Sequence, residues 1–347
     1  MERSDARTIE AEQFCREILP TVSRTFALGI RVLPGDLGAS VRIAYLLCRI
    51  ADTLEDEPDA PAETKAYRLA MFARCFDDPA CVPSFLTALA DLRGDAAHLR
   101  LAANTDLVFR GFEALPERTR SVVRRWVLEM IAGMRKFVLA YPHGMRIQSI
   151  DEYREYCYYV AGTVGHLLTD LWYEHAPSIG PAEYDKLRLR CRAFAEALQT
   201  VNILRDVVRD AEHENSIYIP EQLLRTHGSA HADMFSGGID GAKSALAAMM
   251  RLAHHDLDQA TAYLLAIPRR AVSIRLFCAL PLLFAYATLR DLSRAAEPLA
   301  GDRVKISRAE VKSLTLLSML GVMSNRALGQ LVAIARGSRR SSLYAGR

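Results

Sequence analysis

Three acidic residues close together in one apolar segment are the first candidates for chemistry. Asp52, Glu55 and Asp56 lie within VRIAYLLCRIADTLEDE. On a helix, positions i and i+4 share a face about 6 Å apart, so Asp52 and Asp56 repel each other unless a cation lies between them. A divalent hard cation such as Mg²⁺ takes oxygen ligands and completes its shell with water and phosphate oxygens. The alternative is a solvated acidic helix end, which this motif alone does not exclude.

The polar residues of this segment share one helical face. Tyr45, Arg49, Asp52 and Asp56 follow one another at steps of 4, 3 and 4, and the remaining faces carry Ile43, Leu46, Leu47, Ile50 and Leu54. A helix that is apolar on most sides is buried. We therefore expect the polar stripe to face an internal cavity, because buried carboxylates need partners.

A second polar stripe occurs about 150 residues later, in ALQTVNILRDVVRD. It places Gln199, Asn202, Asp206 and Asp210 at steps of 3, 4 and 4, with Arg205 and Arg209 beside them. Alone, this pattern is also typical of a helix with i, i+4 ion pairs. Two such stripes facing each other across a helical bundle would instead form a carboxylate-lined pocket that clamps diphosphates through Mg²⁺.

The elements that must position these stripes are predicted to be helices. Apolar residues recur at i, i+3, i+4 and i+7 over 8–33, 38–57, 62–76, 83–92, 99–112, 117–141, 150–176, 181–211, 240–267, 269–294 and 307–335. Ser149 or Asp151 is placed to cap the helix that begins near 150, and 225–240 is expected to be a loop. The sequence predicts an all-α fold, with one helical bundle over 1–335 around a central cavity and a basic, disordered tail over 336–347.

Composition narrows the function classes. The 347-residue chain is 50% hydrophobic and has a formal net charge of +3, with basic residues scattered rather than clustered. This distribution argues against nucleic acid as a partner. The seven cysteines stand singly, as expected of reduced, buried thiols. The histidines show no metal-ligand spacing and are interpreted as structural.

The sequence also predicts a cytoplasmic protein. The first 20 residues lack the apolar core of a signal peptide. The apolar stretch from Ser313 to Ala335 is interrupted by Asn325, Arg326 and Gln330, which argues against a membrane span. The basic tail favours peripheral contact with the inner membrane face.

Five segments together resemble a known family. They are SRTFALGIRVLP at 23–34, DTLED at 52–56, YCYYVAGTVG at 156–165, NILRDVVRD at 202–210 and RLFCALP at 275–281. In this order and spacing they are similar to the motifs of the squalene and phytoene synthases. RLFCALP, and VKISRAEV at 304–311, resemble the squalene branch, which uses a nicotinamide cofactor. The sequence departs from the family at Arg209, where an acidic residue is usual, and at Leu282, where eukaryotic members have Gln. It also shows no counterpart of the eukaryotic membrane anchor, which suggests a soluble, bacterial-type enzyme.

The resemblance implies roles for individual residues. Mg²⁺ (Mn²⁺ is the alternative) would be held by Asp52, Asp56, Asn202, Asp206 and Asp210, with Glu55 beside them. Diphosphate would be bound by Ser23, Arg24, Thr25, Arg49 and Arg205. The pocket would be lined by Phe26, Tyr45, Gln199 and Tyr218. Tyr156 matches the family's key tyrosine, Phe277 would wall the carbocation, and Lys305 would offer charge to NADPH.

The resemblance implies condensation of two farnesyl diphosphates, then reduction by NADPH. The alternatives are a phytoene or dehydrosqualene synthase without the hydride step, an enzyme that stops at presqualene diphosphate, and an inactive assembly subunit. Because the chain has no GxGxxG element, any NADPH site would lie on the helical bundle. The glycines Gly162 and Gly165 would allow close approach of either substrate or another backbone.

Overall fold

The structure, a computed structural model, describes residues 2–58, 60–295, 299 and 304–337, although not the side chains of 2–8 and 24. Its helices begin with α1 (Glu2–Val22), α2 (Arg24–Arg31), α3 (Gly35–Glu55), α4 (Ala62–Arg74), η1 (Pro79–Cys81), α5 (Val82–Thr87), α6 (Ala96–Ala103), α7 (Thr105–Glu113) and α8 (Glu117–Ala140). They continue with α9 (Ile150–Cys157), η2 (Tyr158–Gly162), α10 (Thr163–His175), α11 (Pro181–Arg188), α12 (Cys191–His213), α13 (Glu221–Thr226), α14 (Ile239–Ala266), α15 (Val272–Arg294), α16 (Arg308–Gly321) and α17 (Asn325–Arg336).

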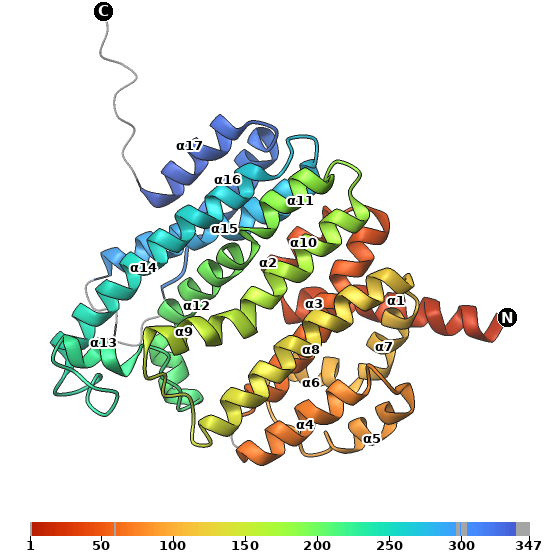
Figure 1. Cartoon of the computed structure of the whole chain (residues 1–347), viewed down its shortest axis with the longest axis horizontal. Helices are drawn as coiled ribbons and strands as arrows, with labels where there is room; N and C mark the ends of the chain where they lie inside the picture. Colours follow the sequence, from red (N-terminus) through yellow and green to blue (C-terminus); the bar gives the residue numbers. More distant parts are fainter. Residues whose placement is uncertain (1, 59, 296–298, 300–303, 338–347) are drawn as a thin grey trace, which may run out of the picture.

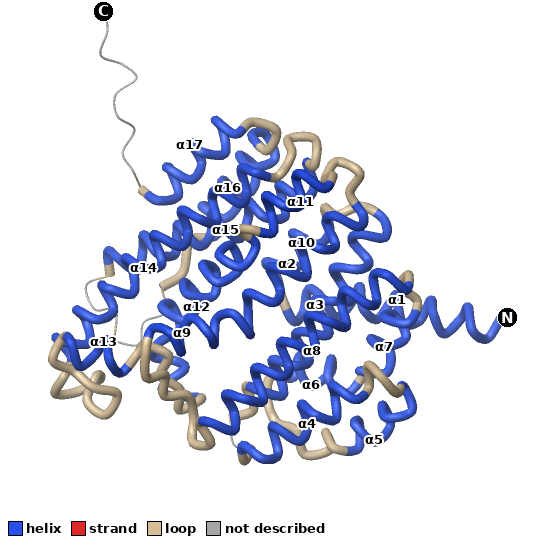
Figure 2. The backbone as a smooth tube through the Cα atoms, in the orientation of Figure 1, coloured by secondary structure: helices blue, strands red, loops and turns tan. Residues whose placement is uncertain are grey.

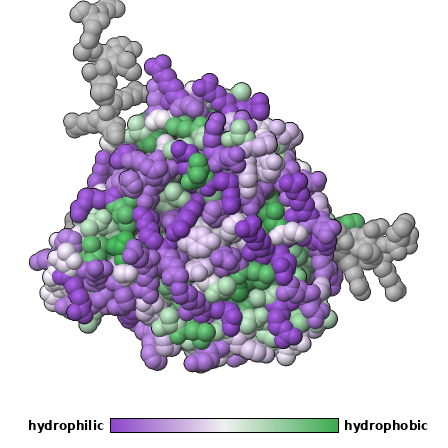
Figure 3. All heavy atoms as spheres, in the orientation of Figure 1, coloured by the Kyte–Doolittle hydropathy of each residue, from purple (hydrophilic) through white to green (hydrophobic). Residues whose placement is uncertain are grey.

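The predicted all-α fold is confirmed. Among the described residues the only β-type pairing is an isolated bridge between Arg146 and Ile217, and helices joined by loops make up the bundle (Figures 1 and 2). On the face drawn in Figure 3, hydrophilic residues predominate and hydrophobic ones gather in small separate patches.

Several predicted helices are broken by polar residues. The segment 8–33 divides at Ser23, whose Oγ accepts a hydrogen bond from the Phe26 N–H at 3.2 Å. The segment 307–335 divides before Asn325, where Ser324 caps α17 in the same way. Segments 99–112 and 181–211 are also two helices each, and α5 ends at Thr87, short of the predicted 92. Apolar periodicity runs on across such breaks, whereas a capping side chain satisfies the free N–H groups of a new helix start.

The tyrosine-rich segment contains a wide helical turn. Ser149 caps α9 as predicted, because its Oγ accepts from the Glu152 N–H at 3.1 Å. After Cys157 the helix continues as a π-helical stretch, Tyr158–Gly162, before α10 resumes. Such π segments are frequent at functional sites. Here the stretch follows directly on Tyr156.

Helix α15 crosses the core. It is the one described helix long and apolar enough to span a membrane, but 78% of its apolar window is buried inside the protein, which is typical of a core helix. The apolar stretch 313–335 is divided between α16 and α17. Helix α17 extends to Arg336, the first residue of the predicted tail, and residues 338–347 of that tail lie outside the described part of the chain.

Gly165 allows two backbones to approach. A Cβ atom at this position would lie 2.2 Å from the backbone oxygen of Cys191, so α10 packs directly on α12. Of the two interpretations of these glycines, close approach of another backbone therefore holds for Gly165.

Gly165→Ala should destabilise the protein by about 1–3 kcal/mol, because a backbone atom cannot move aside as a flexible side chain can. The matched control is Gly329→Ala within α17, where an added Cβ meets nothing within 4 Å. That control should stabilise by about 0.5–1 kcal/mol, through helix propensity. Thermal melts followed by circular dichroism compare the two, and equal shifts would refute the close-packing argument.

Candidate active site

The first acidic motif lies at the C-terminal end of α3. Arg49 Nη1 is 3.4 Å from Asp52 Oδ2, and Arg49 Nη2 donates to the Tyr45 hydroxyl at 3.2 Å. Asp56 caps the end of the helix. Within the predicted stripe, Arg49 therefore contacts both Tyr45 and Asp52.

Burial leaves these carboxyls short of compensating charge. It raises the pKa of Asp52 to about 6, with Arg49 opposing the shift and Asp56 adding to it. The pKa of Glu55 is raised well above its usual value by burial and then by Asp56 and Asp52. Glu55 Oε1 is buried without a hydrogen-bond partner. An unpaired buried carboxylate oxygen is costly, so this end of α3 suits a positively charged group.

The second motif lies on α12. Asp206 is buried and accepts hydrogen bonds from Arg205 Nε at 3.1 and 3.2 Å. The pKa of Asp210 is raised to about 8 by burial, by Glu214 and by Asp206, with Asp56 contributing from α3. The charge of Asp56, at the end of α3, therefore acts on Asp210 of α12.

The sequence analysis did not predict two charged residues of this cluster, Glu214 and Lys65. Glu214 follows α12, and its pKa is raised to about 7 by burial and then by Asp56. It continues the stripe of Asp206 and Asp210 by one more helical turn, a signal that was available in the sequence. Lys65 on α4 donates from Nζ to the Glu55 carbonyl at 2.8 Å. No spacing pattern in the sequence predicts this contact.

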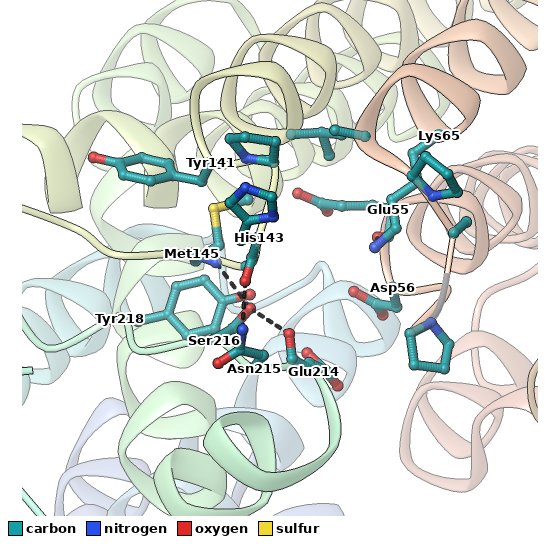
Figure 4. Close-up of a pocket in the computed structure, with 17 residues that line it drawn as sticks. Glu55, Asp56, Lys65, Tyr141, His143, Met145, Glu214, Asn215, Ser216 and Tyr218 are labelled. Atoms are coloured by element: carbon teal, nitrogen blue, oxygen red, sulfur yellow. Dashed lines mark hydrogen bonds between the residues drawn. The ribbon is translucent and has the colours of Figure 1, made fainter. Parts of the chain in front are cut away.

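Glu55 and Asp56 of the first motif, and Glu214 one turn beyond the second, border a cavity of about 340 Å³. Glu55, Asp56 and Lys65 lie on one side, and Glu214 and Tyr218 lie across from them (Figure 4). The loop over 141–145 forms another part of the wall, and it is fixed because the Met145 N–H donates to Ser216 Oγ at 3.0 Å. Three carboxylates, those of Glu55, Asp56 and Glu214, and the ammonium group of Lys65 line this cavity.

A pair of buried tyrosines lies behind the acidic cluster. The Tyr156 hydroxyl donates to the Tyr218 hydroxyl at 3.4 Å, and their rings are 5.0 Å apart. Burial and then Glu55 raise the pKa of both phenols well above the usual value. Both therefore keep their protons at neutral pH and act as hydrogen-bond donors.

A group of aromatic side chains lies next to the first acidic motif, on the side away from the carboxylates. The Phe26 ring is 5.4 Å from Tyr45 and 6.5 Å from Phe277, and the Phe277 ring is 5.4 Å from Trp172. These rings come from α2, α3, α15 and α10, so three of the predicted pocket residues, Phe26, Tyr45 and Phe277, lie together, whereas Gln199 and Tyr218 are not part of this group. Trp172 was not predicted. Such a wall excludes water and presents ring faces that attract cations.

The remaining predicted residues lie at varied places. Ser23 caps α2, Thr25 is exposed, and Arg24 is the first residue of that helix. On α12, Gln199 is half-buried and Asn202 is exposed. Lys305 is exposed in the irregular segment that precedes α16. Their roles stay predictions.

The comparison with known families decides the affiliation. The squalene/phytoene synthase family model matches residues 19–310. This chain belongs to that family. Squalene synthase 1 of Arabidopsis thaliana is 29% identical over 80% of this chain, and the squalene synthase of Ganoderma lucidum is 30% identical over 88%. The match spans 64% and 66% of those two proteins' lengths, respectively.

Solved structures show the same fold. A complex of TcSQS with the ligand BPH1237 superposes with a TM-score of 0.80 at 24% identity, covering 97% of this chain and 94% of that one. A dehydrosqualene synthase complex superposes with a TM-score of 0.61 at 19% identity, covering 96% and 99%. The squalene/phytoene synthase fold thus extends over nearly the whole chain.

Arg209 is the residue at which the second motif departs from the family pattern, and its positive charge acts on the acidic cluster. It lowers the pKa of Asp56, Asp210 and Glu214, although burial keeps each of them raised. Glu214 adds a carboxylate one turn beyond Asp210. The cluster therefore retains its acidic character although Arg209 stands where an acidic residue is usual.

The donor set fits Mg²⁺. Within the described part of the chain, no three Asp, Glu, His or Cys side chains already converge on one point. Mg²⁺ does not need such a cage, because it commonly binds through one or two carboxylates and takes its other ligands from water and substrate phosphates. The unpaired Glu55 oxygen and the raised carboxyl pKa values mark where positive charge is missing.

These pKa shifts predict how stability depends on pH and Mg²⁺. Asp52, Glu214 and Asp210 have folded-state pKa values of about 6, 7 and 8, all above those of the unfolded chain. The folded protein therefore holds extra protons, and their contribution to stability is lost as pH rises from about 4, where the unfolded carboxyls ionise, to about 8. Without Mg²⁺ the Tm should be lower at about pH 8.5 than at about pH 6.5, and added Mg²⁺ should raise it more at the higher pH. An equal Mg²⁺ effect at both pH values, measured by calorimetry, would contradict this prediction.

Proposed function

We propose that this chain is a squalene synthase. It would join two farnesyl diphosphates head to head into presqualene diphosphate and then reduce that intermediate with NADPH to squalene, releasing diphosphate in both steps. The observation that carries the proposal is a cavity lined by Glu55, Asp56, Glu214 and Tyr218. Tyr218 is paired with Tyr156, and an aromatic group joins the α3 motif through the contact of Tyr45 with Arg49.

The polar end of the site would bind the diphosphates. Asp52, Asp56, Asp206 and Asp210, with Glu55 and Asn202, would hold Mg²⁺, or Mn²⁺ in its place. When bound, the metal supplies positive charge that stabilises the leaving diphosphate. Ser23, Arg24, Thr25, Arg49 and Arg205 would hold phosphate oxygens, because guanidinium and hydroxyl donors suit them.

The apolar end would protect the carbocation. Phe26, Tyr45 and Phe277 exclude water, and their ring faces stabilise positive charge. Tyr156 and Tyr218 keep their protons and would donate hydrogen bonds to the departing diphosphate oxygens. In this proposal, charge neutralisation and cation protection would occur at opposite ends of one site.

The NADPH assignment rests on Lys305. Val304 and Ile306 pack partly against the core while Lys305 between them is exposed. An ammonium group held outward in this way fits a cofactor phosphate. Hydride from NADPH would quench the second carbocation.

Lys305→Ala should lower conversion of presqualene diphosphate to squalene about tenfold at limiting NADPH, through loss of one phosphate contact. Formation of presqualene diphosphate should be unchanged. Lys186→Ala, on α11 and exposed, is the matched control. Equal losses in both half-reactions would refute the cofactor role.

Diphosphate release is the first test of the proposed activity. Purified protein with farnesyl diphosphate should release diphosphate only when Mg²⁺ is added. Release with geranylgeranyl diphosphate instead would favour the phytoene synthase alternative. No release with either would favour the inactive assembly subunit. We further propose a cytoplasmic location with peripheral contact to the inner membrane face.

A further inference from the structure

Helix α16 is apolar on the side that faces away from the protein. Its inner side buries Leu314 and Ser318. The opposite side carries Leu316, Met319 and Leu320, and Met323 follows in the turn after the helix. These four residues form an outer stripe and are 59%, 52%, 78% and 63% exposed. Their i, i+3, i+4, i+7 spacing makes the stripe continuous. Single exposed apolar residues are ordinary, but a continuous exposed stripe marks an interaction surface.

The outer stripe is extended by basic residues. Arg308 and Lys312 precede Leu316 at successive steps of four, so they lie on the same face, and both are exposed. From residue 304 to the end, the chain has eight basic residues and one acidic residue, Glu310. Glu310 is already bound by Arg290 at 2.7 and 3.0 Å. The preceding 303 residues carry 36 basic and 40 acidic residues, so the positive charge is concentrated at this end.

This combination does not suit a second copy of the chain. Parallel pairing of two α16 helices would set Arg308 and Lys312 against their equivalents. Antiparallel pairing would set the apolar half of one stripe against the basic half of the other. A two-fold interface must be self-complementary, and this surface is not. A lipid bilayer with anionic headgroups complements both parts of this surface. Its apolar interior suits the outer stripe, and its headgroups suit Arg308 and Lys312.

We propose that the outer stripe and its basic extension, Arg308 and Lys312, dock the protein on an anionic membrane surface. The docking geometry stands on the described side chains, and only its purpose rests on the proposed function. Helix α15 connects the two regions. Leu276 and Leu280 on α15 pack with Val322 at the end of α16, while Phe277 contributes to the aromatic wall. Docking would therefore place the bilayer one helix away from the site that handles apolar chains.

Vesicle co-sedimentation of the full chain tests this proposal without substrate. The probes are vesicles of phosphatidylcholine alone and of phosphatidylcholine mixed with phosphatidylglycerol. Leu320→Gln should weaken binding to both about tenfold, because it removes an inserted apolar side chain. Lys312→Gln should weaken binding about fivefold on the anionic vesicles only. Leu189→Gln is the matched control, since Leu189 is 81% exposed between α11 and α12 and is not part of the outer stripe, and it should bind like the native chain.

Several results would overturn the docking proposal. They are absence of vesicle binding by the native chain, native-like binding by Leu320→Gln or Lys312→Gln, and equal weakening by Leu189→Gln. Sedimentation velocity adds another: a native dimer that Leu320→Gln converts to a monomer, with vesicle binding unchanged, would assign the stripe to a second copy. Because binding is measured without substrate, a chain that docks but forms no product would defeat the proposed activity alone.

Discussion

Asp206→Asn should lower the rate of diphosphate release from farnesyl diphosphate by about a hundredfold to a thousandfold, the range for losing one charge-stabilising group at a reacting centre. The change keeps the shape of the side chain and removes its negative charge, so the helix and the Arg205 contact have little reason to move. Asp52→Asn should act similarly from α3. The cause in both is weaker Mg²⁺ binding opposite the leaving diphosphate.

The control for these variants is Asp185→Asn, at an exposed position on α11. It should keep the native rate, and circular dichroism should show native helicity in all three proteins. The affinity for Mg²⁺, measured by calorimetry with a non-reactive diphosphate, should fall in the two site variants only. A native rate in either Asp52→Asn or Asp206→Asn would remove the basis for the metal site.

Arg68→Met should lower the free energy of unfolding by about 3–5 kcal/mol, the range for breaking a buried ion pair from one side. Arg68 and Glu57 form a salt bridge in which their side chains are only 2% and 4% exposed. Arg68 Nε also donates to the Ala88 carbonyl at 2.9 Å, and Glu57 Oε1 accepts from the Arg93 N–H at 3.0 Å. Removing Arg68 leaves the Glu57 carboxylate buried without its counter-charge.

The exposed pair Arg124–Asp77 supplies the comparison for Arg68. Its side chains are 45% and 60% exposed, so Arg124→Met should cost at most about 1 kcal/mol. Urea titrations of both variants measure the difference. Because Glu57 directly follows Asp56, Arg68→Met should also weaken Mg²⁺ binding. Equal midpoints for the two variants would mean that the buried pair adds no more than a surface pair does.

The sequence predicted the parts of the site that helical periodicity controls. Tyr45, Arg49 and Asp52 meet because steps of three and four return to one face of a helix, and the contacts on α3 confirm it. Glu214 was missed because the helix was predicted to end near 211, whereas α12 extends to His213. One further turn of the same pattern would have included it.

Other features depend on tertiary packing and could not be read from spacing. Lys65 reaches the Glu55 carbonyl from α4, and Trp172 reaches Phe277 from α10. Neither pair is related by a helical repeat. The π stretch after Cys157 and the break at Ser23 interrupt apolar patterns that continue across them, so periodicity alone predicted unbroken helices there.

Product identification by mass spectrometry, with and without NADPH, tests the central claim most directly. Purified protein, farnesyl diphosphate and Mg²⁺ should give squalene only when NADPH is present, and presqualene diphosphate or dehydrosqualene when it is omitted. The same product regardless of NADPH would contradict the squalene synthase proposal and assign the protein to the non-reductive branch of its family.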